Sequence, residues 1–184
     1  IRPDEQQALS LKLAVNPQAS GEGHWCLQLC GTEGQAIFNL NFAFVDAKSV
    51  LIGSVQGQHD VLASIQSLTK TCHGLRPHHL LLQAFLFLCQ AWGITQIAGI
   101  APRNHLKGRW NQRKRLKFDY EALWQETGGQ LQSQGRAKGN WLLPSTPPRK
   151  ALEEIASKKR SQYKKRYAML DALQAELLAF AQTS

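Results

Sequence analysis

The sequence lacks several features that would place it in a common functional class. No apolar run reaches the roughly 20 residues of a membrane-spanning helix, and no internal repeat is evident. No Cys-x-x-Cys pair occurs, and the neighbouring His78 and His79 have no further ligands at metal-binding spacing. We therefore expect no metal site and four buried, reduced cysteines. These are Cys26, Cys30, Cys72 and Cys89.

Acidic residues are scarce in the second half of the chain. Residues 1–100 carry five Lys or Arg and six Asp or Glu, a net charge of −1. Residues 101–184 carry 17 Lys or Arg and seven Asp or Glu, a net charge of +10. This imbalance predicts an anionic partner. A solubilising surface is the alternative, although surface charge is usually of mixed sign.

The first half of the chain alternates apolar and polar residues in short segments, which is the period of β-strands. Four strands are predicted, over residues 9–15, 25–30, 36–45 and 49–55. Short turns separate them, so the strands are expected to form an antiparallel meander.

A helix–strand unit follows the meander. The run His78–Trp92 is apolar on nearly all sides, and Pro77 before it and Gly93 after it are typical helix boundaries. This pattern predicts a buried core helix, and the next apolar segment predicts a buried strand. Strand, helix and strand in this order imply one parallel crossover. The other predicted elements are helices over residues 61–68 and 118–127 and strands over residues 94–101 and 140–143.

The C-terminal segment is the most informative part of the sequence. Apolar residues recur at threes and fours over residues 149–182, which predicts an amphipathic helix with one face on the core. Basic residues occupy the other faces of the predicted helix. These faces either bind an anionic partner or are simply exposed to solvent. A second basic segment, residues 102–117, precedes this helix in the sequence. Two residues of that segment and seven of the helix form the predicted anion- and partner-binding set. The set is Arg113, Lys114, Arg149, Lys150, Lys158, Lys159, Arg160, Lys164 and Arg166.

The loop before the core helix is a candidate cofactor site. Free N–H groups at a helix start attract anions, glycine permits close approach and arginine adds a charged fork. The predicted cofactor-binding residues are Gly74, Leu75 and Arg76. The alternative is an ordinary helix start with an exposed arginine.

A second candidate lies where parallel strands end, which is a common position for active sites. Asn104 and His105 follow the crossover strand, and Asp60 follows the neighbouring strand. His105 or Asp60 is a candidate general base. A surface histidine bonded to its own loop is the alternative.

Several strings together resemble the VirK/YbjX family of bacterial proteins. They are Gly74-Leu-Arg-Pro77, Asn104-His105, Tyr120…Trp124-x-Glu126-x-Gly-Gly129, Leu143-Pro144 and the basic string from Arg149 to Asp171. The resemblance covers about residues 45–175. It implies a bacterial protein associated with virulence, envelope remodelling and tolerance of antimicrobial peptides. It also implies a longer N-terminus than that of this chain, which opens at Ile1.

The order of elements also resembles the GNAT fold, which toxin-activating acyltransferases share. The expected fold class is therefore α/β, with a GNAT-like mixed sheet made of the antiparallel meander and one parallel crossover. Flanking helices and the C-terminal basic helix complete the expected single domain over residues 1–184. The loop Cys72–Pro77 departs from the usual phosphate-loop motif, so this likeness is one of topology.

These resemblances predict an acyltransferase that moves an acyl group to an amine or hydroxyl acceptor. The donor would be acyl-CoA or an acyl-carrier protein. The basic helix would meet an acidic carrier, a phosphate-bearing cofactor or anionic lipid. The alternative is a non-enzymatic module for anionic lipid or nucleic acid, of which nucleic acid is disfavoured because no recognisable motif is present. The expected location is cytoplasmic or peripheral to the inner membrane.

Overall fold

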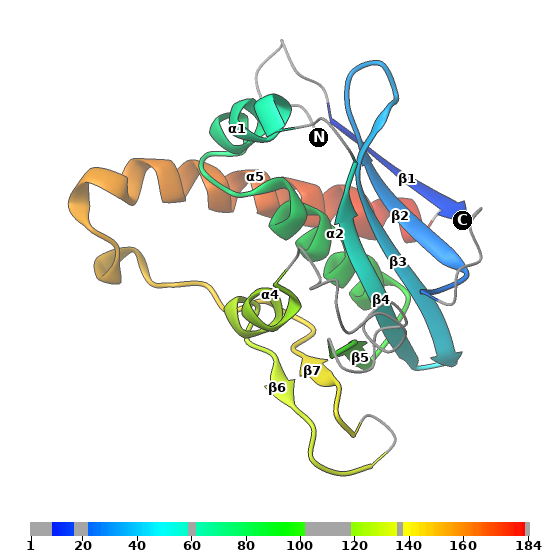
Figure 1. The fold of residues 1–184 in the computed structure, drawn as a ribbon. Coiled ribbons are helices and arrows are strands. Elements are labelled where there is room, and N and C mark those ends of the chain that lie inside the picture. The colour runs from blue at the N-terminus through cyan, green and yellow to red at the C-terminus, as the bar shows by residue number, and fades with distance from the viewer. Residues whose placement is uncertain (1–8, 17–21, 59–61, 102–118, 136–137, 183–184) are drawn as a thin grey trace.

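The fold is built on one seven-stranded mixed sheet (Figure 1). The computed structural model describes residues 9–16, 22–58, 62–101, 119–135 and 138–182. The strand order is β1-β2-β3-β4-β5-β7-β6, and only β4 and β5 pair in parallel. The strands are β1 Ser10–Val15, β2 Trp25–Cys30, β3 Ala36–Asp46, β4 Ser49–Gly57, β5 Gln96–Gly99, β6 Gln130–Leu131 and β7 Trp141–Leu143. The predicted α/β class, the antiparallel meander and the single parallel crossover are confirmed.

Helix α2, Pro77–Ala91, is the centre of the hydrophobic core. It packs against β2, β3 and β4 on one side and against α5 on the other. This double contact explains why its sequence is apolar on nearly all sides. Pro77 begins the helix, and Gly93, with φ of 67°, ends it by allowing the left-handed turn. The other α-helices among the described residues are α1 Leu62–Thr71, α4 Tyr120–Glu126 and α5 Ser157–Gln182.

The C-terminal helix is shorter than predicted, because it begins at Ser157 and not at residue 149. Residues before it form an extended segment and a 3₁₀ turn over Leu152–Glu154. Ile155 has extended backbone angles (φ −93°, ψ 132°) and a buried side chain, so burial of this residue outside the helix breaks the predicted period. Leu170 and Leu173 then anchor the helix on α2.

The four cysteines are buried and free, as predicted. Burial raises the pKa of Cys89 to about 12 and the pKa of Cys72 to about 11, so these thiols stay protonated.

Polar side chains line the face of β2, β3 and β4 that points away from α2. Asn41 donates to the Ser54 hydroxyl at 2.9 Å, and Gln28 donates to Asn39 at 3.2 Å. Although Ser54 and Asn41 are buried, this hydrogen bond satisfies both side chains. The sheet therefore has an apolar core face and a polar second face.

Candidate functional site

The parallel strands β4 and β5 separate after a short ladder. They pair from Ser49–Gln96 to Ile52–Gly99, and a last hydrogen bond joins Ile100 N–H to the Ile52 carbonyl. Strand β4 then continues to Gly57 without a β5 partner. A strand edge freed in this way exposes backbone donors and acceptors that another group must satisfy.

The side chain of Tyr120 occupies this freed edge. Val55 N–H donates to the Tyr120 hydroxyl at 3.2 Å, and the hydroxyl donates to the Val55 carbonyl at 3.2 Å. Tyr120 is the first residue of α4 and is only 2% exposed. One phenol thus satisfies both backbone groups where the neighbouring strand has ended.

A buried carboxylate lies close to this phenol. Gln56 donates to Glu22 at 3.0 Å, and Glu22 is 6% exposed. Burial raises the pKa of Tyr120 to about 12; the Glu22 carboxylate adds to this rise, whereas hydrogen bonds to Val55 and Gln56 oppose it. Tyr120 therefore stays protonated at neutral pH and is available as a hydrogen-bond donor.

The loop before α2 contains the three predicted cofactor-binding residues. His73 and Gly74 have left-handed backbones, with φ of 52° and 78°. Leu75 is buried, whereas Arg76 is exposed at the N-terminal boundary of α2. Of these three residues, Arg76 has an exposed side chain that can bind an anion at the start of α2.

Helix α5 holds this loop in place through Arg166. The Nε and Nη2 atoms of Arg166 donate to the His73 carbonyl at 3.1 and 2.9 Å, and its guanidinium lies 4.2 Å from the Tyr163 ring centre. A Cβ at Gly74 would lie 2.7 Å from Gln162 and 2.9 Å from Arg166. The absence of a side chain at Gly74 therefore allows Gln162 and Arg166 of α5 to pack against this loop.

A histidine–glutamate pair lies beside Arg76. His79, in the first turn of α2, has its Nε2 atom 2.9 Å from a carboxylate oxygen of Glu126, at the end of α4. Burial lowers the pKa of His79; Arg76 and Arg166 act in the same direction, and Glu126 opposes them. The imidazole is then neutral, and because Nε2–H donates to Glu126, Nδ1 keeps the lone pair that accepts a proton.

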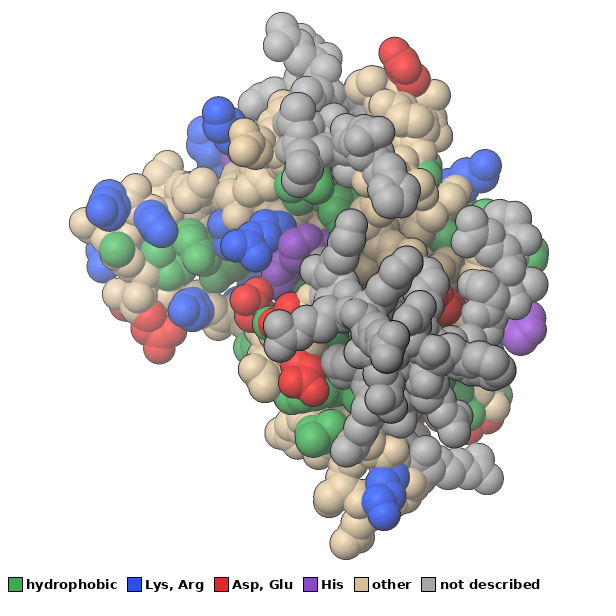
Figure 2. Space-filling view, viewed as in Figure 1, with side chains coloured by type: hydrophobic (Ala, Val, Ile, Leu, Met, Phe, Trp, Pro, Cys, Tyr) green, Lys and Arg blue, Asp and Glu red, His purple; other side chains and the backbone are tan. Residues whose placement is uncertain are grey.

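Figure 2 shows histidine side chains between basic and acidic side chains in the middle of one face of the molecule. The candidate site therefore consists of two contacts at opposite ends of α4: the Tyr120 phenol on Val55, and the neutral His79 imidazole on Glu126, with Arg76 nearby. These groups can polarise a carbonyl, accept a proton and bind a phosphate.

The predicted binding residues of the C-terminal segment fall into two groups. Three arginines hold the fold: Arg166 binds the loop, Arg160 donates to the Ile155 carbonyl at 2.9 Å, and Arg149 pairs with Asp171 at 2.6 Å. The lysines are exposed and form a basic surface on α5 and the segment before it. They are the predicted Lys150, Lys158, Lys159 and Lys164, together with Lys165, which was not in the predicted set.

Five predicted residues lie outside the described part of the chain. They are Asp60, Asn104, His105, Arg113 and Lys114. Within the part that is described, no group of three or more His, Cys, Asp or Glu side chains is arranged to hold a metal ion.

Several residues of this candidate site have no recognisable functional signal in the sequence. Tyr120 and Glu126 belong to the string that resembles the VirK/YbjX family, but the string alone indicates a core aromatic and a surface acid. The buried Glu22 sits in a turn-like segment whose sequence carries no functional pattern. The family string was the one signal that could have identified Tyr120 and Glu126.

Comparison with known proteins gives a family and relatives but no assigned activity. A family model described as "Protein of unknown function (DUF535)" matches residues 1–179. An uncharacterized protein of Haemophilus influenzae is 34% identical over 172 residues, which are 92% of this chain and 57% of that protein. Escherichia coli "Uncharacterized protein YbjX" is 30% identical over 181 residues, 94% of this chain and 53% of that protein.

A shorter match is "Membrane protein LapB" of Mannheimia haemolytica, 32% identical over 96 residues, which are 50% of this chain and 42% of that protein. The chain thus spans about half the length of the curated relatives it matches. No solved structure matches it. Among the described helices, none has the length and apolar character needed to cross a bilayer.

Proposed function

This chain belongs to the DUF535 (VirK/YbjX) family, and we propose that it is an acyltransferase. The reaction moves an acyl group from a CoA or acyl-carrier thioester to an amine or hydroxyl acceptor. The observation that carries the proposal is the freed edge of β4, where Tyr120 binds both backbone groups of Val55. The strand order with one parallel pair, which resembles the GNAT plan, supports it.

In the proposed reaction, the thioester carbonyl oxygen replaces the contact between Val55 and Tyr120. The Val55 N–H and the Tyr120 O–H then both donate to this oxygen and stabilise the charge that develops as the acceptor attacks. The acceptor forms a bond to the carbonyl carbon, the carbon–sulfur bond breaks, and the thiolate leaves and takes up the proton that the acceptor has lost. Because the pKa of Tyr120 is raised to about 12, this residue acts as a hydrogen-bond donor and not as a base.

His79 is our candidate for the group that accepts the proton of the acceptor. Its lowered pKa keeps it neutral, and Glu126 fixes its orientation. Tyr120 and Glu126 are six residues apart on α4, so the carbonyl site and the His79–Glu126 pair lie about 9 Å apart along this helix. The alternative bases His105 and Asp60 stay predictions.

Arg76 would hold the phosphate groups of the donor. Its exposed guanidinium stands beside the start of α2, where backbone N–H groups also favour an anion. The resemblance to a family associated with envelope remodelling suggests an acceptor in the bacterial envelope.

A donor-binding and turnover experiment tests the proposal. Purified protein is heated with acyl-CoA or acyl-carrier thioesters of several chain lengths, and thiol release is followed with amine acceptors. A donor at 100 times its Kd should stabilise the protein by about 2.7 kcal/mol, and Arg76→Ala should abolish the shift. Tyr120→Phe should still bind the donor but release thiol roughly 100-fold more slowly. Tyr163→Phe is the matched control, and the absence of a shift with every donor would overturn the proposal.

A non-enzymatic anion-binding module is the second candidate, and the exposed lysines of α5 favour it. No acidic residue occurs between Ile155 and Leu170. The printed name of the LapB relative, "Membrane protein", is compatible with an anionic lipid surface. Salt-sensitive binding to anionic vesicles that the double substitution Lys164→Glu and Lys165→Glu abolishes, without any thioester turnover, would favour this candidate.

A further inference from the structure

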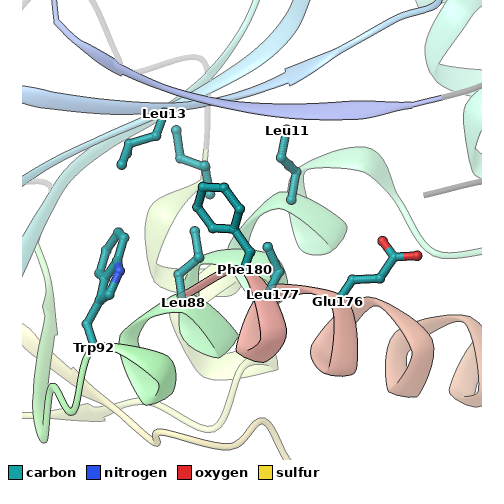
Figure 3. A pocket seen from close by; sticks show the side chains of 8 residues that line it. Leu11, Leu13, Leu88, Trp92, Glu176, Leu177 and Phe180 are labelled. Carbon is teal, nitrogen blue, oxygen red and sulfur yellow. The ribbon is translucent and has the colours of Figure 1, made fainter. Parts of the chain in front are cut away.

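An apolar slot opens at the far end of α2 from the candidate site. It lies between the first strands of the sheet and the ends of α2 and α5, and it has a volume of about 330 Å³. Figure 3 shows leucine side chains and Phe180 between Trp92 at one end and Glu176 at the other. The main lining residues are Leu11, Leu13, Leu88, Trp92, Leu177 and Phe180.

The slot exists because the helices do not cover the whole sheet. Helix α2 packs on β2, β3 and β4, so the leucines of β1 border a gap that is lined on its other side by the end of α2 and the last turns of α5. Leu13 is 44% exposed and Phe180 is 60% exposed. Apolar surface left open to water is unfavourable, and protein interiors rarely contain voids larger than a water molecule. An occupant that removes this surface from water would therefore bind favourably.

The chemistry of the lining identifies the occupant. Among the described residues that line the slot, Glu176 is the single ionisable side chain and the others are apolar. A peptide segment would bring backbone N–H and C=O groups, for which the lining side chains offer no hydrogen-bond partner except the Glu176 carboxylate and the Trp92 indole N–H. A hydrocarbon chain brings none, and a volume of 330 Å³ accommodates about ten methylene-sized groups.

We propose that this slot binds one alkyl chain of an amphiphile such as a lipid. Leu88 is nine residues beyond His79, so the slot is about 13 Å along α2 from the histidine–glutamate pair. The slot is thus separate from the proposed acyl-transfer site. Alkyl-chain binding in the slot can therefore be tested independently of acyl transfer.

Quenching of tryptophan fluorescence tests this proposal, because Trp92 lines the slot. The probe is 10-bromodecan-1-ol, whose neutral head avoids charge interactions with Glu176. Saturable quenching is expected, and Trp92→Phe should remove most of it. In competition with unlabelled alkanols, each added methylene should tighten binding about fourfold until about ten carbons.

Matched leucine variants locate the binding. Leu13→Glu, at one edge of the sheet, should weaken binding more than tenfold, as should Phe180→Asp. Leu131→Glu is the control, since Leu131 is also an exposed strand leucine (53%) but lies on β6 at the opposite edge. Circular dichroism and urea midpoints verify that each variant folds. Vesicles of brominated phosphatidylcholine distinguish a membrane lipid from a dissolved amphiphile as the source of the chain.

Three results would overturn the proposal. They are quenching that does not saturate, affinity that does not depend on chain length, and equal binding by Leu13→Glu and wild type. A wild-type dimer that Leu13→Glu dissociates, with no alkanol binding, would instead make this surface an interface between two copies of the chain.

Discussion

Replacing Arg166 should destabilise the fold, because this residue joins α5 to the loop before α2. Replacing it with alanine removes two N–H donors from the His73 carbonyl and the contact with the Tyr163 ring. A hydrogen bond to a charged group contributes about 1.5–3 kcal/mol, and a cation–π contact contributes about 0.5–1 kcal/mol. Because both donors share one carbonyl and the side chain is half-buried, we expect a loss of about 2–3 kcal/mol.

Urea unfolding, followed by circular dichroism, measures this loss. Lys165→Ala is the control, since it removes an exposed charge from the preceding position and should change the free energy of unfolding by less than about 0.5 kcal/mol. Arg166→Lys should recover only part of the loss, because lysine lacks the planar fork. The melting temperature of Arg166→Ala should fall by roughly 5–10 °C. Equal free energies of unfolding for Arg166→Ala and Lys165→Ala would refute the structural role.

Trp124 and His78 each give a further prediction about stability. Gly99→Ala would place a Cβ 2.6 Å from the fully buried Trp124 indole, whose N–H is bonded to the Ile100 carbonyl, so we expect a loss of about 1–3 kcal/mol in urea unfolding; an unchanged urea midpoint would contradict this packing. Burial lowers the pKa of His78 to about 4, so its contribution to stability is complete above pH 6.5 and is lost as the pH falls toward 4. His78→Gln should flatten the urea midpoint over this range, and equal slopes for both proteins would contradict the prediction.

Local patterns were sufficient to predict most elements of the fold. Alternation located β1 to β4, and the apolar run bounded by Pro77 and Gly93 located α2. The predicted start of α5 was wrong because Ile155 fits the apolar period of the helix, although it is buried in an extended segment before the helix begins. The two-residue strand β6 was missed because so short a segment has no period of its own.

The site could be predicted only in part, because its contacts join residues that are distant in sequence. Arg166 and the His73 carbonyl are 93 residues apart, and Tyr120 and Val55 are 65 residues apart. Residue type and spacing identified the loop Gly74–Arg76, which does border the site. Pairing of His79 with Glu126 required the packing of α4 against the start of α2, which no local pattern reports.

The long stretch of sequence between α2 and α5 has a consequence during synthesis. Helix α2 buries apolar residues on its α5 side as well as its sheet side, yet α5 ends about 90 residues after α2. At about 5–20 residues per second, a ribosome needs roughly 5–20 s to complete this distance. During this interval the side of α2 that α5 covers is exposed on the nascent chain. The emerging protein therefore keeps an apolar surface exposed until α5 has been synthesised and has docked on α2.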